Sequence, residues 1–167
     1  MIPKGHLYDL FTLEQIHTTA SDKLYLLVNG LQYEKMTGKI IEYKKNISMP
    51  LFLQYPNSKY ASAGPWLIEA RYIDNQHLQE IRDIEPSAPM LSWIVSQEKI
   101  DRLTLLLANH LYVSLPNNES ALFRFYDPRV LNKLDDFLSE QQKSTLTIGI
   151  QKWFYVFDNQ MKWFKWI

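Results

Sequence analysis

The stretch Leu24-Tyr25-Leu26-Leu27-Val28 is an unbroken run of apolar residues, and Asn29-Gly30 ends it. A short apolar run that contains aromatic and β-branched residues and stops at a turn signal is typical of a strand buried on both faces. Such a strand needs neighbours on both edges and cover on both faces. We therefore expect it near the centre of a sheet.

The rest of the chain alternates between helical and strand periodicity. Helices are predicted at residues 12–20, 31–45, 75–82, 96–110 and 128–138, and further strands at residues 51–55, 66–68, 91–95, 111–115, 121–126, 153–157 and 161–167. The last two pairs of strands, each joined by a turn-rich segment, are expected to be antiparallel hairpins. The sequence thus predicts an α/β (α+β) fold, with a single domain over residues 1–167 and a mixed, largely antiparallel sheet flanked by helices.

Capping signals mark three of the predicted helix starts. Thr12-Leu13-Glu14-Gln15 matches a capping box, and Ser96 is placed to cap a helix with Glu98 in its first turn. Asp127-Pro128 also suits a helix start, because the carboxylate can accept free N–H groups while proline at the first position lacks only a donor that is not needed.

The composition excludes several classes of protein. The 18 Lys and Arg residues balance the 18 Asp and Glu residues, so no net positive charge attracts nucleic acid or an anionic membrane. The absence of Cys excludes disulfides and thiolate metal sites, and the five Gly residues stand too far apart for a phosphate-binding loop. No apolar run approaches the roughly 18 residues of a membrane span. We expect a soluble, cytoplasmic protein without a cofactor and with neither nucleic acid nor membrane as partner.

Residue types that carry catalysis are present, but we find no useful arrangement of them. No two of the four His residues lie three or four positions apart, and we expect none to have a carboxylate at a spacing that suits metal binding. No Ser stands in a glycine-flanked turn that would expose a nucleophile. The sequence predicts no catalytic residue, no metal ligand and no enzymatic activity.

Aromatic and charged residues concentrate where a predicted strand meets the helix that Asp127-Pro128 begins. Strand alternation puts Phe123 and Phe125 on one face and Arg124 and Tyr126 on the other. We call the following residues the signature corner: Arg124, Phe125, Tyr126, Asp127, Pro128 and Arg129.

Two roles remain open for the arginines of the signature corner. Arg124 and Arg129 can pair with Asp127 or another acid of the chain and so fix the corner. Alternatively, one of them binds a partner's carboxylate through two parallel hydrogen bonds.

The two C-terminal strands carry apolar residues on both faces. One face can enter the core, whereas the other needs cover from another part of the chain or from a partner protein. Because Trp and Tyr often anchor protein interfaces, the candidate contacts are Trp153, Tyr155, Trp163 and Trp166.

The unbroken segment Leu122 to Leu131 resembles the signature of the bacterial type VI secretion effector adaptor/chaperone family, long catalogued as a domain of unknown function. Three other pieces are similar to elements of that family and occur in the same order: Leu24 to Gly30, Gly64 to Leu67, and Ile100 to Leu115. Together these segments extend over most of the chain.

This resemblance implies a non-enzymatic function. A protein of this kind holds a secreted effector protein and promotes its loading onto the spike protein (VgrG-type) of the secretion apparatus. The competing interpretation is a small immunity or carbohydrate-binding interaction module, in which surface aromatic rings contact the ligand.

Overall fold

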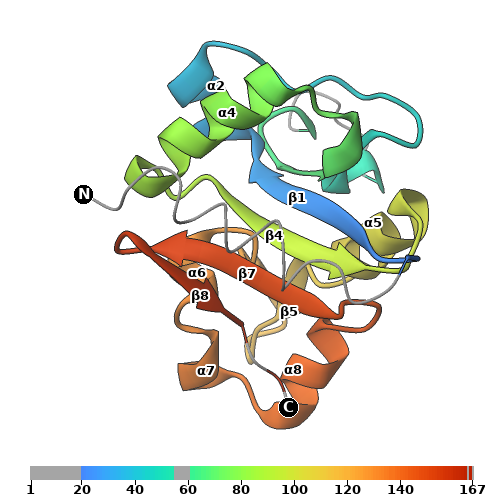
Figure 1. Cartoon of the computed structure of the whole chain (residues 1–167). Coiled ribbons are helices and arrows are strands. Elements are labelled where there is room, and N and C mark those ends of the chain that lie inside the picture. The colour runs from blue at the N-terminus through green and yellow to red at the C-terminus, as the bar shows by residue number, and fades with distance from the viewer. Residues whose placement is uncertain (1–19, 55–60, 165, 167) are drawn as a thin grey trace.

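The computed structural model describes residues 20–54, 61–164 and 166. Its central layer is a six-stranded sheet in the order β2-β3-β1-β4-β7-β8, and each pair of neighbouring strands is antiparallel (Figure 1). The predicted α/β fold with a largely antiparallel sheet is confirmed. The strands of this sheet are β1 (Lys23–Asn29), β2 (Ser48–Pro50), β3 (Pro65–Glu69), β4 (Leu91–Ser96), β7 (Lys152–Phe157) and β8 (Gln160–Trp163).

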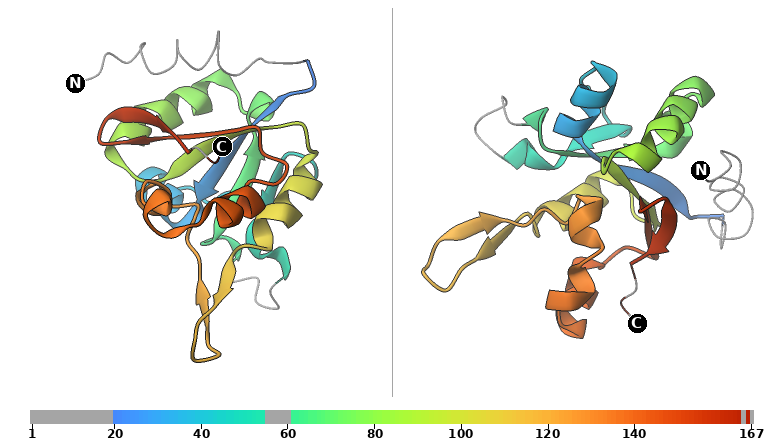
Figure 2. Two further views of the ribbon diagram at one scale, coloured as in Figure 1. Left: turned by 90° about the horizontal axis from the view of Figure 1, so that it is seen from below. Right: turned by 90° about the vertical axis from the view of Figure 1, so that its left-hand side faces the viewer.

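The helices are short, and they pack on both faces of this sheet (Figure 2). The α-helices are α2 (Gly30–Thr37), α4 (Asn75–Ile84), α5 (Ile100–Ala108), α6 (Pro128–Leu131), α7 (Leu134–Phe137) and α8 (Glu140–Leu146). The 3-10 helices are η1 (Leu51–Gln54), η2 (Ala70–Tyr72) and η3 (Glu85–Ser87). No helix in the described part of the chain is both long enough and apolar enough to cross a membrane.

Strand β1 is central, as predicted, and is paired with β3 on one edge and β4 on the other. Its side chains divide between two hydrophobic cores because successive residues of a strand point to opposite faces. Tyr25 and Leu27 face the first core, which η1, α5, α6, α7 and α8 cover. Leu26 and Val28 face the second core, which η2 and α4 cover.

A second, two-stranded sheet stands apart from the six-stranded one. β5 (Tyr112–Ser114) and β6 (Ser120–Leu122) form the antiparallel hairpin that the sequence predicts. This hairpin projects from the body of the molecule on the side of the first core (Figure 2). We call it the projecting hairpin.

The C-terminal hairpin is also confirmed, with β7 and β8 paired from Phe154 opposite Trp163 to Phe157 opposite Gln160. Asp158 and Asn159 connect the strands with φ angles of 51° and 57°. Two consecutive positive φ angles match the twist of the flanking strands in a two-residue turn, and Asp and Asn tolerate them better than most residues.

Two predictions upstream of β3 are wrong in part. The predicted helix over residues 31–45 ends at Thr37, because Gly38 adopts a φ of 70° and its N–H bonds to the carbonyl of Glu34. The predicted strand over residues 51–55 is a 3-10 helix from Leu51 to Gln54, and β2 precedes it. An apolar run has no periodicity that separates a buried strand from a buried helical turn, and Leu51 is buried in the first core.

The predicted elements around the signature corner are shorter than expected. The strand stops at Leu122, so alternation does not extend to Phe125 and Tyr126, which are both buried in a turn. The helix over residues 128–138 is divided into α6 and α7. Phe137, an apolar residue within the predicted helix, is 55% exposed.

The three capping predictions have different outcomes, and that at Asp127-Pro128 is confirmed, because Asp127 caps α6. The box at residues 12–15 lies outside the described residues. Ser96 ends β4 instead of capping a helix, and α5 begins after Lys99. A helix that was not predicted, α8, begins at Ser139 with a capping box completed by Gln142, a signal that the sequence contains.

A buried hydrogen bond joins two strands of the six-stranded sheet and gives a test of the core. The indole N–H of Trp153 on β7 donates to the hydroxyl of Ser92 on β4 at 2.9 Å, and both residues are fully buried. Ser92→Ala should lower the free energy of unfolding by about 1–3 kcal/mol, because the indole N–H then has no acceptor. Urea denaturation followed by tryptophan fluorescence measures this change. Ser144→Ala, at an exposed position of α8, is the control, and equal stability of the two variants would contradict the prediction.

Candidate protein-interaction surfaces

Asp127 fixes the signature corner through three hydrogen bonds. Its carboxylate accepts the backbone N–H of Arg129 at 2.9 Å and the Arg129 guanidinium through Nε at 3.0 Å and Nη2 at 2.7 Å. The carboxylate is buried, and these bonds raise the pKa of Arg129 above its ordinary value. Of the two roles left open by the sequence, the geometry gives Arg129 the pairing within the chain.

Arg124 is not part of this ion pair. Its guanidinium lies 6.0 Å from the centre of the Tyr126 ring, and its side chain is exposed. Burial raises the pKa of the Tyr126 hydroxyl. Both arginines of the signature corner are exposed, and Arg124 is the one whose guanidinium is not held by Asp127.

The signature corner and the C-terminal hairpin, which the sequence predicts separately, contact each other in the first core. Phe125 contacts the Trp153 ring edge-to-face, with 6.1 Å between ring centroids, and contacts Tyr126 in the same way. Pro128 is buried beside them. The aromatic residues of the corner are core residues that hold the chain against β7.

The four candidate contacts in the C-terminal hairpin separate into two pairs. Trp153 and Tyr155 are 0% and 4% exposed, so the structure places them in the first core and not at a surface. The Tyr155 hydroxyl donates to the side chain of Asn132 at 3.3 Å, and burial raises its pKa to about 12. Trp163 and Trp166 are half-buried, and contact with a partner stays a prediction for these two.

The projecting hairpin is an exposed apolar surface that the sequence did not identify. Each of its large apolar residues is about 40% exposed, although strands with this composition are usually buried. The ring of Phe137 on α7 contacts Phe123 at the base of the hairpin, with centroids 6.5 Å apart. We define the hairpin surface by its exposed apolar residues: Tyr112, Val113, Leu115, Leu122 and Phe137.

A groove of about 320 Å³ runs between the base of this hairpin and α8. Tyr112 and Val113 line one side, and Gln141 and Thr145 line the other. Burial lowers the pKa of His110 at the end of the groove. The described lining has no carboxylate, lysine or arginine, so the groove suits an uncharged segment of a partner.

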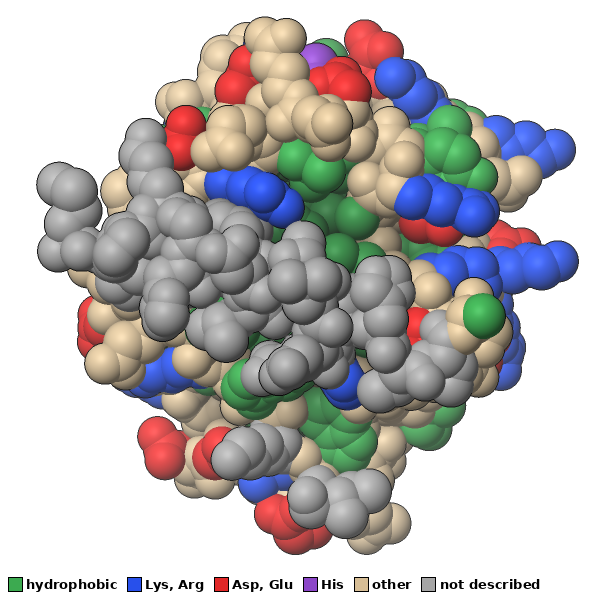
Figure 3. Space-filling view, in the orientation of Figure 1, with side chains coloured by type: hydrophobic (Ala, Val, Ile, Leu, Met, Phe, Trp, Pro, Cys, Tyr) green, Lys and Arg blue, Asp and Glu red, His purple; other side chains and the backbone are tan. Residues whose placement is uncertain are grey.

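A second candidate surface lies on the opposite face of the sheet, where a pocket of about 290 Å³ opens between α4 and the chain that follows α2. Its floor is aliphatic and belongs to the sheet and α4, with Val28, Ile68 and Ile81 among the lining residues. Ile40 and Tyr72 at its rim are 57% and 50% exposed. In the space-filling view, hydrophobic side chains lie between charged ones at this end of the molecule (Figure 3). We call this site the α4 pocket.

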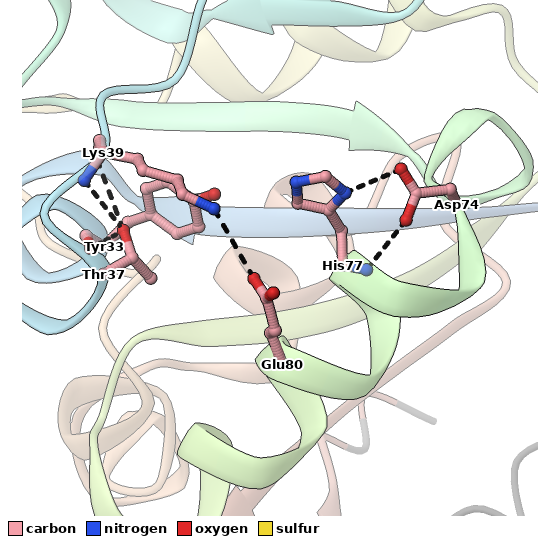
Figure 4. A network of polar contacts seen from close by, with 6 residues as sticks. All are labelled: Tyr33, Thr37, Lys39, Asp74, His77 and Glu80. Carbon is pink, nitrogen blue, oxygen red and sulfur yellow. Dashed lines mark hydrogen bonds and ion pairs between the residues drawn. The ribbon is translucent and has the colours of Figure 1, made fainter.

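Polar contacts hold the rim of the α4 pocket (Figure 4). Asp74 caps α4 by accepting the backbone N–H of His77 at 2.9 Å, and its other oxygen lies 2.6 Å from the His77 ring. These contacts lower the pKa of Asp74, and the hydrogen bond from the backbone N–H of His77 has the largest effect. Thr37 at the end of α2 accepts the backbone N–H of Lys39, whose ammonium group lies 3.7 Å from Glu80.

This network corrects one expectation from the sequence. Asp74 precedes His77 by three residues and Glu80 follows it by three, so a histidine does have carboxylates at helical spacing. The Asp74 contact is part of a helix cap. No group of three or more His, Asp or Glu residues placed to hold a metal is found among the described residues.

The fold defined by these elements is an α/β domain with an antiparallel sheet, a projecting hairpin and a pocket on the opposite face. The family described as "Domain of unknown function (DUF4123)" has a model that matches residues 24–145, from β1 to α8. The chain therefore belongs to this family. No curated protein and no solved structure matches the chain.

The geometry of the signature corner predicts a stability defect on removal of its cap. Asp127→Ala should lower the free energy of unfolding by about 1 kcal/mol, since the start of α6 loses its side-chain acceptor. Thermal denaturation measures the loss, and Asp136→Ala at an exposed position of α7 is the control. Unchanged stability together with lost partner binding would make the corner a contact site.

Proposed function

We propose that the protein is a non-enzymatic adaptor/chaperone. It binds a type VI secretion effector in the cytoplasm and promotes loading of that effector onto the spike (VgrG-type) protein. The resemblance of the Leu122–Leu131 segment to that adaptor family supports the proposal.

The observation that carries this proposal is the position of two exposed apolar surfaces on opposite faces of one sheet. The hairpin surface belongs to the side of the first core, to which Leu111 and Phe125 attach the chain at either end of the hairpin. The α4 pocket opens on the side of the second core, above Val28 and Leu91. A protein that joins two others needs two such surfaces, and opposite faces leave room for both partners at once.

The proposed action requires binding without turnover. A protein that binds only the loading-competent state of the effector stabilises that state by mass action. The Lys and Arg residues balance the Asp and Glu residues, so long-range attraction contributes little. Selection of the partner then depends on packed apolar contacts at the two surfaces.

Purification from the native host tests the proposal directly. The tagged protein should recover both the effector and the spike protein encoded beside its gene. Recovery of neither protein overturns the proposal. Neutralisation of a neighbouring toxin without binding to the spike would support the immunity-protein alternative.

The two surfaces should be separable by mutation. Val113→Glu in the hairpin surface and Ile40→Glu at the α4 pocket should each weaken one partner, because a charge placed against an apolar interface loses its hydration. The dissociation constant of each variant for the purified effector and spike measures the effect. Leu105→Glu, on an exposed apolar position of α5, is the control and should bind both. Loss of the same partner in both variants contradicts the assignment of two surfaces.

A further inference from the structure

We infer that the outer edge of β6 binds an extended segment of the effector as a third strand of the small sheet. This inference rests on the proposed function and gives the hairpin surface a specific mode of recognition. Addition of a strand to an exposed edge supplies affinity through backbone hydrogen bonds and specificity through alternate side chains.

The hydrogen bonds of the projecting hairpin determine which backbone groups point outward. The N–H of Phe123 donates to the carbonyl of Leu111 at 2.7 Å. The N–H of Leu115 donates to the carbonyl of Glu119, also at 2.7 Å. In an antiparallel ladder, paired residues alternate between bonded and non-bonded pairs. The bonded positions are therefore Glu119, Ala121 and Phe123. Ser120 and Leu122 alternate with them and turn their N–H and C=O groups away from β5.

These outward groups form a recognition edge of two donors and two acceptors. Within the described part of the chain, no residue pairs with this edge of β6, and the hairpin extends away from the larger sheet (Figure 2). Natural proteins protect a free edge by keeping it very short or by placing charged side chains, proline or a bulge on it. The β6 edge is short, at three residues, but Ser120-Ala121-Leu122 has no charged residue, proline or bulge.

The side chains along the edge specify the chemistry of the added strand. Leu122 is exposed beside Tyr112, its cross-strand neighbour, so the added strand places an apolar residue there. The edge is flanked by exposed Glu119 at one end and exposed Arg124 at the other. Opposite charges on neighbouring strands attract. The complementary segment is apolar or β-branched in its middle, basic near Glu119 and acidic near Arg124.

The effector is the partner that needs this kind of binding. A chaperone must cover a segment whose backbone groups are unpaired before secretion, and an added strand satisfies those groups directly.

Two serines of the hairpin provide a matched test. Ser114 and Ser120 face each other across the strands, and both turn their backbone outward, one on the β5 edge and one on the β6 edge. Proline removes an outward N–H in either position without removing a bond between β5 and β6. Ser120→Pro should weaken binding of the effector encoded beside the gene by about tenfold, because one backbone acceptor of the effector segment loses its donor. Ser114→Pro should stay within about twofold of wild type.

Amide hydrogen exchange of the wild-type protein provides a measurement that does not depend on folding of the variants. Addition of the effector should slow exchange at Ser120 and Leu122. Equal loss of binding in both proline variants, or unchanged exchange at these two amides in a complex that forms, overturns strand addition and leaves the adaptor proposal intact. If the wild-type protein binds neither the effector nor the spike, the adaptor proposal itself is overturned.

Discussion

Burial of β1 on both faces and both edges is the constraint on which the rest of the structure depends. Tyr25 and Leu27 require one layer of helices, and Leu26 and Val28 require another. The chain must cross the sheet repeatedly to provide both layers, and each candidate surface lies outside one of them. The separation of the hairpin surface from the α4 pocket is thus a result of how the central strand is covered.

The signature corner connects this core to the exposed part of the molecule. Phe125 packs on Trp153, while Asp127 and Arg129 fix the turn that follows. The two ends of the projecting hairpin therefore come from α5 and from a turn held by an ion pair whose carboxylate, on Asp127, is buried. A rigid base of this kind presents a short hairpin that has no sheet neighbour among the described residues, although isolated two-stranded hairpins are only marginally stable.

The sequence was most informative where a single local rule determines the result. The apolar run at 24–28 predicted β1, and Asp127-Pro128 predicted the start of α6. Predictions failed where contacts between distant segments determine the structure. Leu51 was expected in a strand, but a 3-10 turn buries its side chain equally well. Trp153 was a candidate surface residue, but Phe125 from a distant segment covers it. Exposure of Val113 could not be predicted, because its apolar run reads like that of a buried strand.

The open edge of β6 has a consequence for the concentration at which the protein works. Two copies of this chain present the same edge to each other, and antiparallel pairing of identical strands satisfies the same four backbone groups. Formation of such pairs increases with the square of the concentration of the free protein, whereas the proposed capture of an effector depends on the concentrations of both species. Under the proposed function, synthesis in step with the effector keeps most edges available, whereas an excess of the protein leaves a smaller fraction of its edges free.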